Sequence, residues 1–253
     1  MNKSVFIKNQ IKSFKKKSII VDGDKSISIR FVLLSSLSSG RCFAKNLLES
    51  DDVLSAINIV KKLGIKVKIK SKFCEIIGKG LFGLKFKKNL ILDSGNSGTT
   101  ARLICGMLAN SNFWITITGD KSLKKRDMKR IIIPIKKFGT KFKRNKTKLP
   151  ISFKGPKILK PIKYTEKLGS AQCKSALMIA ALKSKGETNL KCLPSRDHTE
   201  LMFKNVLKIP IHIKKREGYD YIKLKGMNEF KNFNYKIPGD ISSASFFIVL
   251  TLL

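Results

Sequence analysis

Apolar and polar residues alternate along the chain with two different periods. Stretches such as "IKVKIK" (65–70) place every second side chain on one face, which is typical of a strand with one buried face. Stretches such as "SISIRFVLLSSL" (26–37) place Ile27, Phe31 and Leu34 on one face of a helix. Short strands and helices follow one another in this way along the chain, which predicts a mixed α/β fold.

One turn pattern recurs four times. Each copy is a glycine-led polar turn followed by an apolar helical stretch, and the copies begin at Gly23, Gly95, Gly169 and Gly239. The intervals are 72 (95 − 23), 74 (169 − 95) and 70 (239 − 169) residues. Spacing as even as this indicates a single supersecondary unit that is used repeatedly.

The order of elements within the unit is clearest around Gly23. The expected order is β-α-β-α-β-β, and the predicted segments are a strand "KSIIV" (17–21), a helix (26–37), a strand "RCFAKNL" (41–47), a helix "SDDVLSAINIVKKLG" (50–64) and the strands "IKVKIK" (65–70) and "FCEII" (73–77).

The second and third units repeat this order. We expect the second to continue through a strand "FWITIT" (113–118) and a helix over 122–138. The third continues through a strand "ETNLKCL" (187–193) and a helix after Arg196. Three complete units are therefore predicted over residues 21–238, with a fourth beginning at Gly239.

Charge changes this picture more than the rest of the composition does. The chain has 53 Lys and Arg residues against 17 Asp and Glu, a net charge of +36. This charge favours anionic partners, either small phosphorylated molecules or nucleic acid. The lysines are spread over every segment and form no single stripe, so the charge alone gives only weak support for nucleic-acid binding.

Cysteines and apolar runs indicate the cellular compartment. The five cysteines are odd in number and widely spaced, with no Cys-x-x-Cys pair, which fits reduced thiols in a cytoplasmic protein. The first 17 residues lack the apolar core of a signal peptide. The apolar stretch 241–253 is shorter than the roughly 20 residues that a membrane span needs.

Polar and basic residues gather where the predicted helices begin. A helix start offers unpaired backbone N–H groups and a partial positive charge, so several starts that face one point would form an anion site. Ser, Asn and Gly are also ordinary helix caps, but their recurrence in register favours a site for several phosphate or carboxylate groups. The residues concerned are Lys25, Ser26, Asn96, Gly98, Ser170 and Gln172, with Arg30 and Arg102 one turn further along the first two helices.

Other candidate motifs carry less weight. "SRDHTE" (195–200) contains Arg196 and His198, although Asp197 and Glu200 have the spacing of a helix-capping pair. The two histidines have no metal-ligand spacing, so the sequence does not support a metal site. No P-loop or dinucleotide-binding glycine motif follows a predicted strand, and a nucleotide cofactor has no support.

Several of these segments together resemble one known family. The segments, in chain order, are "GDKSIS" with Arg30, "LDSGNSGTTARL", "TGDKSLKKR", "GSAQCKSALMIAAL", "RDHTE" and "PGDISSASFF". Their order and spacing resemble the enolpyruvyl transferases, and among these the EPSP synthases (3-phosphoshikimate 1-carboxyvinyltransferases). The branch that acts on UDP-N-acetylglucosamine typically has Asn where this chain has Ser26, so Ser26 favours the shikimate branch.

The resemblance implies an activity and a set of site residues. The implied reaction transfers the enolpyruvyl group of phosphoenolpyruvate to the 5-hydroxyl of shikimate 3-phosphate and releases phosphate. It belongs to the shikimate pathway of chorismate and aromatic amino-acid biosynthesis in the cytoplasm, and needs no metal or organic cofactor. The implied contacts to shikimate 3-phosphate are Lys25, Ser26, Arg30, Ser170, Ala171, Gln172 and Arg196; those to phosphoenolpyruvate are Lys25, Asn96, Gly98, Arg126 and Gln172, with Lys25 as the catalytic residue.

The resemblance also implies a domain organisation. The family folds as two lobes, each an inside-out α/β barrel of three β-α-β-α-β-β units around a pseudo-threefold axis. We therefore expect residues 21–238 to be one complete lobe, and 1–20 and 239–253 to be remnants of the other, discontinuous lobe, most of which is missing. That missing lobe would hold the family's acidic residue that acts on the substrate hydroxyl, so the chain is expected to bind substrate and turn over poorly alone. The helix after Gly239 is expected to expose its apolar face.

Two other functions stay open from the sequence. One is an inactive partial enzyme, and the other is a basic nucleic-acid-binding protein built on the same scaffold. The +36 charge motivates the second, while an aromatic content of 8% and the lack of a basic stripe argue against it.

Overall fold

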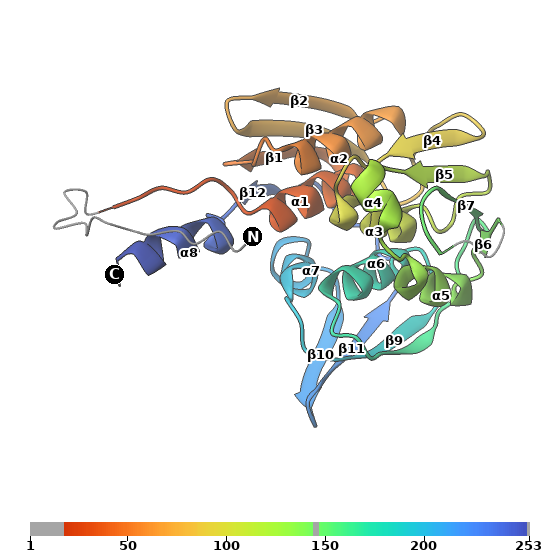
Figure 1. Cartoon of the computed structure of the whole chain (residues 1–253). Coiled ribbons are helices and arrows are strands. Elements are labelled where there is room, and N and C mark those ends of the chain that lie inside the picture. The colour runs from red at the N-terminus through yellow and green to blue at the C-terminus, as the bar shows by residue number, and fades with distance from the viewer. Residues whose placement is uncertain (1–17, 144–146, 252–253) are drawn as a thin grey trace, which may run out of the picture.

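Three sheets surround a centre made of helices (Figure 1). The computed structural model describes residues 18–143 and 147–251. Within these ranges the chain forms three four-stranded sheets, ordered β12-β1-β3-β2, β4-β5-β7-β6 and β8-β9-β11-β10. The central helices are α1 (Lys25–Leu37), α3 (Gly98–Met107) and α6 (Ala171–Ala181). This arrangement, with the helices inside and the sheets outside, confirms the predicted fold class.

The three sheets share one topology. In each, the first two strands of the order are parallel, and the remaining neighbours are antiparallel. The strands are β1 (Ser39–Lys45), β2 (Lys66–Lys70), β3 (Phe73–Lys79), β4 (Leu90–Asp93), β5 (Ile115–Thr118), β6 (Lys141–Phe142), β7 (Ile151–Lys154), β8 (Lys163–Glu166), β9 (Glu187–Cys192), β10 (Ile211–Arg216), β11 (Tyr219–Lys225) and β12 (Asn234–Lys236). The identical strand order confirms that one unit is repeated.

The first strand of the first unit comes from an unexpected part of the chain. Residues 18–21 form no strand, and Ile20 is 95% exposed, so the strand predicted at "KSIIV" is wrong over the described residues; Lys17 lies outside them. β12 instead pairs in parallel with β1, with Asn234 opposite Phe43. Because β12 occupies this sheet edge, no room is left for the earlier segment, and the first unit is completed by residues that follow the third.

The central helices are buried on all sides. The pattern at 26–37 predicted a single buried face, but every residue from Ile27 to Leu37 of α1 is buried. A helix is buried all round only where other elements surround it, as they do here. Gly106 allows α3 and α6 to approach closely, because a Cβ at this position would lie 2.1 Å from the carbonyl oxygen of Ala176.

The outer helices are shorter and less regular than expected. α2 (Asp51–Lys62) buries one face through Val53, Ile57 and Val60, as its sequence predicted. The single helix expected over 122–138 is two helices, α4 (Lys121–Lys125) and α5 (Lys129–Lys137), because Arg126 between them has an extended backbone (φ −76°, ψ 138°). The helix after Arg196 is α7 (His198–Leu201), followed by a π-helical turn, Met202–Val206.

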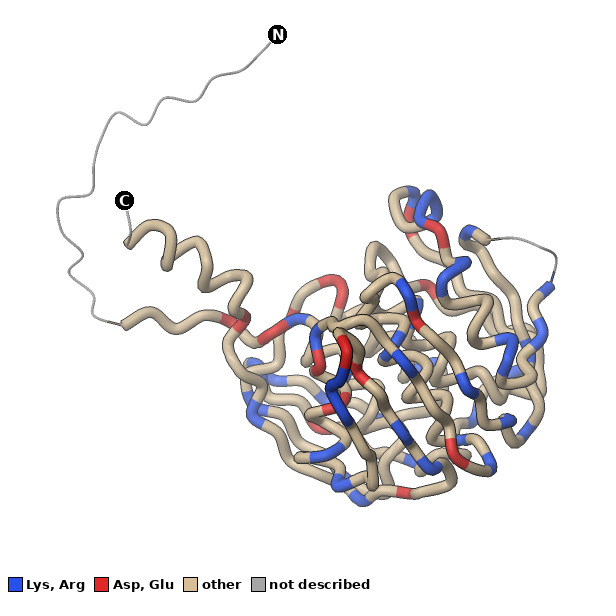
Figure 2. Tube along the Cα trace, turned by 90° about the horizontal axis from the view of Figure 1, so that it is seen from below, with Lys and Arg blue, Asp and Glu red and all other residues tan. Residues whose placement is uncertain are grey.

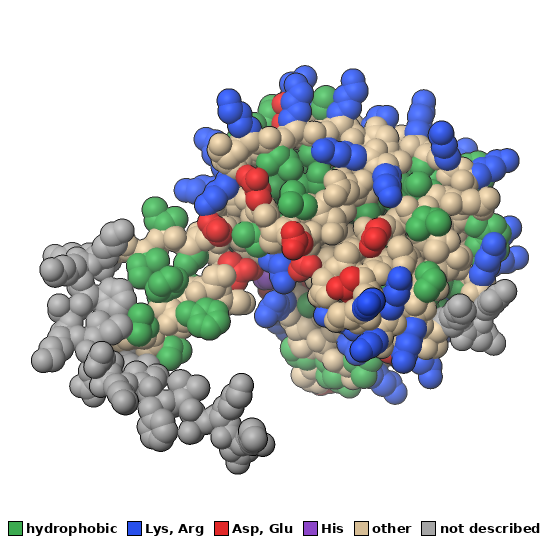
Figure 3. Space-filling view, turned by 45° about the horizontal axis from the view of Figure 1, so that its top comes forward, with side chains coloured by type: hydrophobic (Ala, Val, Ile, Leu, Met, Phe, Trp, Pro, Cys, Tyr) green, Lys and Arg blue, Asp and Glu red, His purple; other side chains and the backbone are tan. Residues whose placement is uncertain are grey.

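α8 (Ile241–Leu250) projects from the body of the molecule (Figures 1 and 2). None of its residues is buried, and Phe246 is 78% exposed. Figure 3 shows apolar side chains along this projecting segment, which confirms the predicted exposure. Among the described helices, none has the length and apolar character that crossing a membrane would require.

The segment before α1 and the segment before α8 lie side by side where α8 leaves the body. The amide of Asp24 donates to the carbonyl of Pro238 at 2.8 Å, and the amide of Asp240 donates to the carbonyl of Asp22 at 2.8 Å. The Asp240 carboxylate also accepts a hydrogen bond from the amide of Lys25 at 3.2 Å. The boundary between residues 21–238 and a second lobe stays a prediction, and residues 1–17 of the proposed remnant 1–20 lie outside the described part of the chain.

Candidate active site

A basic cleft opens where α1 and α6 begin. Its volume is about 370 Å³. Among the described residues that line it, three are arginines and none is acidic. The lining residues are Ser26, Arg30, Arg130, Gly169, Ser170, Ala171, Gln172, Ser195, Arg196 and His198. The cleft therefore brings together Ser26, Arg30, Ser170, Ala171, Gln172 and Arg196, which the family resemblance assigned to shikimate 3-phosphate, with Gln172 assigned to phosphoenolpyruvate as well.

Side-chain caps fix the starts of the three central helices. Asp24, Ser97 and Ser170 precede α1, α3 and α6, and each side chain accepts a hydrogen bond from a backbone amide of the first turn. The Ser170 hydroxyl accepts from the amide of Cys173 at 3.3 Å. Ser170 is thus a structural cap, and its position at the mouth of α6 also places it on the cleft wall.

Arg30 is held firmly by the protein. Its side chain lies between α1, α6 and α7, where Nε donates to Thr199 Oγ1 at 2.8 Å and Nη2 donates to Ser175 Oγ at 2.7 Å. Nη1 donates to the carbonyl of Ser26 at 3.0 Å. A guanidinium has five N–H donors, so two remain for a ligand in the cleft. Burial lowers the pKa of Arg30 to about 10, opposed by Glu200 and Asp24, and the group stays charged at neutral pH.

A second guanidinium links α3 to α6. Arg102, which is 7% exposed, donates through Nη1 to Gln172 Oε1 at 2.7 Å. The Gln172 amide nitrogen donates in turn to Thr99 Oγ1 at 2.8 Å. Burial lowers the pKa of Arg102, as do the nearby charges of Arg130 and Arg126. Gln172 is therefore fixed in place between the two helices, at the edge of the cleft.

Asn96, Gly98 and Arg126 form a neighbouring group at the start of α3. Arg126 Nη2 donates to Asn96 Oδ1 at 3.3 Å, and Asn96 Nδ2 donates to Asp120 Oδ2 at 2.6 Å. A Cβ added to Gly98 would lie 2.7 Å from Nη1 of Arg102 and 3.2 Å from Nη1 of Arg126. The absence of a side chain at Gly98 therefore lets two guanidinium groups meet over the N-terminus of α3, where a helix favours an anion.

Lys25, like Asn96, Gly98 and Arg126, does not line the cleft. Its ammonium group forms an ion pair with Asp52 Oδ2 at 2.9 Å, and its side chain is 49% exposed. Exposed ion pairs of this kind contribute about 0–1 kcal/mol, so the ammonium group is easily exchanged to a ligand phosphate.

Sequence reasoning missed two groups on the cleft wall. Arg130 lies on α5 and Arg126 lies in the extended break before that helix, so the single helix predicted over 122–138 was a poor guide to the direction of Arg130. Ser195 lies before α7, and its Oγ is a buried atom without a hydrogen-bond partner among the described residues. His198 Nδ1 is likewise a buried atom without a hydrogen-bond partner among the described residues. Burial and the positive charge of Arg30 lower the pKa of this histidine.

The capping pair suggested for "SRDHTE" is wrong. Asp197 precedes α7 but its side chain makes no capping hydrogen bond. Glu200 points into the core, where it pairs with the fully buried Lys174. The segment instead presents Ser195, Arg196 and His198 to the cleft. Unpartnered buried donors beside several guanidinium groups are suited to bind a ligand with more than one anionic group.

The chain was compared with protein families and with known proteins. The family model for EPSP synthase (3-phosphoshikimate 1-carboxyvinyltransferase) matches residues 10–253. A protein of Caldicellulosiruptor bescii named 3-phosphoshikimate 1-carboxyvinyltransferase is 44% identical over 241 residues, which are 93% of this chain and 54% of that protein. A protein of the same name from Thermoanaerobacter sp. is 42% identical over 245 residues, 96% of this chain and 56% of the relative.

Solved structures give the same result. An EPSP synthase from Acinetobacter baumannii superposes with a TM-score of 0.83 and 35% sequence identity, over 91% of this chain and 52% of that one. The chain spans about half the length of the curated relatives it matches. The family model covers nearly all of the chain, and the repeated units around central helices agree with it: the chain belongs to the EPSP synthase family.

Proposed function

We propose that this chain binds shikimate 3-phosphate in the cleft at the starts of α1 and α6, for transfer of an enolpyruvyl group from phosphoenolpyruvate to its 5-hydroxyl. One observation carries the proposal: the cleft is lined by Arg30, Arg130 and Arg196 and, over the described residues, by no carboxylate. Guanidinium groups suit phosphate and carboxylate because they donate two parallel hydrogen bonds.

In this proposal the residues divide between the two substrates. Contacts to shikimate 3-phosphate come from Ser26, Arg30, Ser170, Ala171 and Arg196, and contacts to phosphoenolpyruvate come from Asn96, Gly98 and Arg126, while Lys25 and Gln172 reach both substrates. The position of Gln172 supports this division, since it joins α6 to Arg102 at the start of α3. Arg102 adds positive charge on the phosphoenolpyruvate side.

Lys25 is the proposed catalytic residue. Transfer requires a proton to reach the methylene carbon of phosphoenolpyruvate while the 5-hydroxyl oxygen, as it loses its own proton, attacks the neighbouring carbon. The tetrahedral intermediate then loses phosphate and one proton of its new methyl group, which restores the double bond. An ammonium group beside the donor stabilises the charge that develops in these steps. Lys25 is the first residue of α1 and directly precedes Ser26 of the cleft, so exchange of its ion pair with Asp52 for the phosphate brings it to the donor. The described lining residues are assigned to binding and charge stabilisation, because none of them is a carboxylate that could take the hydroxyl proton.

Calorimetric titration with shikimate 3-phosphate tests the binding proposal. We expect Arg196→Ala to weaken binding by about 10-fold or more, because a hydrogen bond to a charged group contributes about 1.5–3 kcal/mol. Arg216→Ala is the matched control, since Arg216 is exposed on β10, where it pairs with its neighbour Glu217 and lies over the ring of Tyr221 outside the cleft. Equal affinity for shikimate without its phosphate, or equal losses in the two variants, would contradict the proposal.

Two further measurements separate the other functions. Phosphate release in the presence of both substrates measures turnover, and we expect Lys25→Met to lower whatever rate the chain shows by a larger factor than it weakens the affinity for shikimate 3-phosphate. A labelled single-stranded oligonucleotide tests nucleic-acid binding. Lys and Arg are distributed over the whole body (Figure 2), so we expect weak binding that disappears at moderate salt. Tight binding that is insensitive to shikimate 3-phosphate would favour the nucleic-acid function instead.

A further inference from the structure

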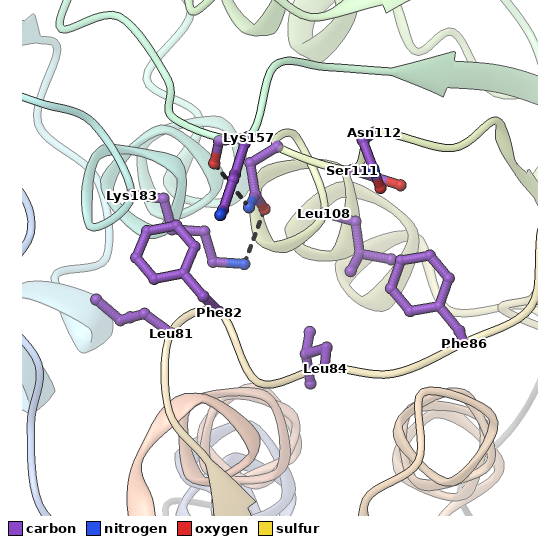
Figure 4. A pocket seen from close by; sticks show the side chains of 10 residues that line it. Leu81, Phe82, Leu84, Phe86, Leu108, Ser111, Asn112, Lys157 and Lys183 are labelled. Carbon is purple, nitrogen blue, oxygen red and sulfur yellow. Dashed lines mark hydrogen bonds between the residues drawn. The ribbon is translucent and has the colours of Figure 1, made fainter.

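A second cavity lies at the opposite ends of α3 and α6 from the candidate active site (Figure 4). Its volume is about 300 Å³, which is at the lower end of the range for small-molecule sites. The segment that links β3 to β4 supplies Phe82, Leu84 and Phe86 to its wall, and Leu108 after α3 lies across from them. One wall of the cavity is therefore apolar and partly aromatic, and the rest of the lining is polar, formed by Asn110, Ser111, Asn112, Lys157 and Lys183.

One of the two lysines of the lining, Lys183, is buried beside the apolar wall. Lys183 follows α6 and is 1% exposed. Its Nζ donates to the carbonyl of Met107 at 2.7 Å and to Asn110 Oδ1 at 3.0 Å. A lysine ammonium has three N–H donors, so these two acceptors leave one donor free among the described residues. Figure 4 shows Nζ directed toward the space between the apolar side chains.

The charge of Lys183 has no counter-charge within the described part of the chain. No Asp or Glu lines the cavity, and no ion pair of Lys183 is found there. Burial alone lowers the pKa of Lys183 to about 7. The buried Lys174 is different, because two acidic side chains, Glu200 and Asp220, neutralise it. The two hydrogen bonds of Lys183 go to neutral acceptors, and a buried ammonium group without a counter-charge is costly, so an anion placed beside it would offset that cost.

A purely structural role explains only part of this arrangement. The bond to Met107 satisfies a carbonyl at the C-terminal end of α3, where a lysine is favourable. Such a cap does not require aromatic side chains around an open space next to it. Phe82 is 38% exposed, which is more than a core phenylalanine would show and leaves apolar surface uncovered in the cavity.

We propose that this cavity binds a small aromatic monocarboxylate. The ring lies against Phe82, Leu84 and Phe86, and the carboxylate accepts the free N–H of Lys183. Lys157 is at the rim and is the other titratable group among the described residues that line the cavity. One anionic group is matched to one buried cation, and this distinguishes the cavity from the arginine-rich cleft, which suits ligands with several anionic groups.

Calorimetry with 3-phenylpropionate and its neutral amide tests this site. We expect the acid to bind at least 10-fold more tightly than the amide, and Lys183→Met to remove that difference. Lys157→Met is the control, and it should change affinity by less than about threefold. Saturating inorganic phosphate, which would occupy the arginine-rich cleft, should leave the acid bound. Equal affinity for acid and amide, or displacement by phosphate, would overturn the proposal.

A second measurement does not depend on whether Lys183→Met folds. At pH 8 the free chain has Lys183 mostly neutral, and a bound carboxylate favours the ammonium form, so binding should take up close to one proton. At pH 6 the ammonium form is already present and uptake should be near zero. Titration in two buffers of different ionisation enthalpy measures this number. Absence of proton uptake at pH 8 would mean that the carboxylate does not contact Lys183.

Discussion

Gly98→Ala should weaken the binding of phosphoenolpyruvate much more than the binding of shikimate 3-phosphate. The added methyl group would lie 2.7 Å from Arg102 Nη1 and 3.2 Å from Arg126 Nη1. Both contacts are closer than carbon and nitrogen normally approach, so both guanidinium groups must move. Each is the end of a flexible side chain, so the backbone need not shift, and Ala in a helix is favoured over Gly by up to about 1 kcal/mol. Movement of Arg102 Nη1 weakens its bonds to Gln172 Oε1 and to the carbonyl of Gly98, and the two effects offset each other, so we expect the stability of the variant to stay within about 1 kcal/mol of that of the natural chain.

The affinity for phosphoenolpyruvate, in contrast, should fall in this variant. If one charge-assisted hydrogen bond to phosphoenolpyruvate is lost, the cost is about 1.5–3 kcal/mol, which corresponds to roughly 10- to 150-fold weaker binding. Shikimate 3-phosphate should lose much less affinity, because Ser26, Arg30 and Arg196 lie on the other side of Gln172. Calorimetry with each ligand separately, together with a thermal unfolding curve, measures the three quantities.

Two outcomes would refute this reasoning. Equal weakening for both ligands would mean that the start of α3 serves the whole cleft and not one substrate. Unchanged affinity for phosphoenolpyruvate would mean that Arg102 and Arg126 do not contact it. Arg126→Ala is the companion variant: because Arg126 is exposed and hydrogen-bonds Asn96 at 3.3 Å, its removal should lower affinity without destabilising the fold.

Three other results are expected. Lys174→Met should lower the free energy of unfolding, measured in urea, by about 3–5 kcal/mol, because it leaves Glu200 and Asp220 buried without their cation. Adding Glu200→Gln and Asp220→Asn removes the unpaired charges and should recover at least half of this loss. A triple variant that recovers nothing would count against the charge argument. Because burial lowers the pKa of Lys183 to about 7, its contribution makes the chain more stable as pH rises from about 7 to about 10, by up to about 1.4 kcal/mol per pH unit, and this slope should be reduced in Lys183→Met. Phe246→Ser on exposed α8 should reduce self-association in light scattering without changing the unfolding temperature, whereas equal scattering would place the contact elsewhere.

The repeat was visible in the sequence because helix starts are local features. A capping residue, a glycine and an apolar run lie within a few residues of each other, so the starts at Gly23, Gly95 and Gly169 could be predicted without knowing what packs on them. Strand pairing between distant segments leaves no such local mark. β12 completes the first sheet through residues far along the chain from β1, and the more β-branched "KSIIV" was the better local candidate.

The candidate site was predictable to a similar extent. The recurring positions placed Ser26, Ser170 and Gln172 correctly on one cleft. The helical pattern could not show that Ser175 and Thr199 hold the guanidinium of Arg30, because these contacts come from two other elements. Arg130 faces the cleft from α5, which is separated from α4 by the extended backbone of Arg126. The spacing of apolar residues, which predicts helices, does not show such a break.

The two segments that precede α1 and α8 are hydrogen-bonded to each other, and this has a mechanical consequence. Two adjacent segments joined by hydrogen bonds in both directions resist twisting more strongly than a single connection, but they can still bend together. Asp240 lies where these segments meet, and its carboxylate accepts from the amide of Ser242 in α8 and from the amide of Lys25 in α1. A displacement of α8 is therefore transmitted through Asp240 to the backbone amide of Lys25, the first residue of α1. The start of α1, next to Ser26 of the cleft, would move together with the projecting helix.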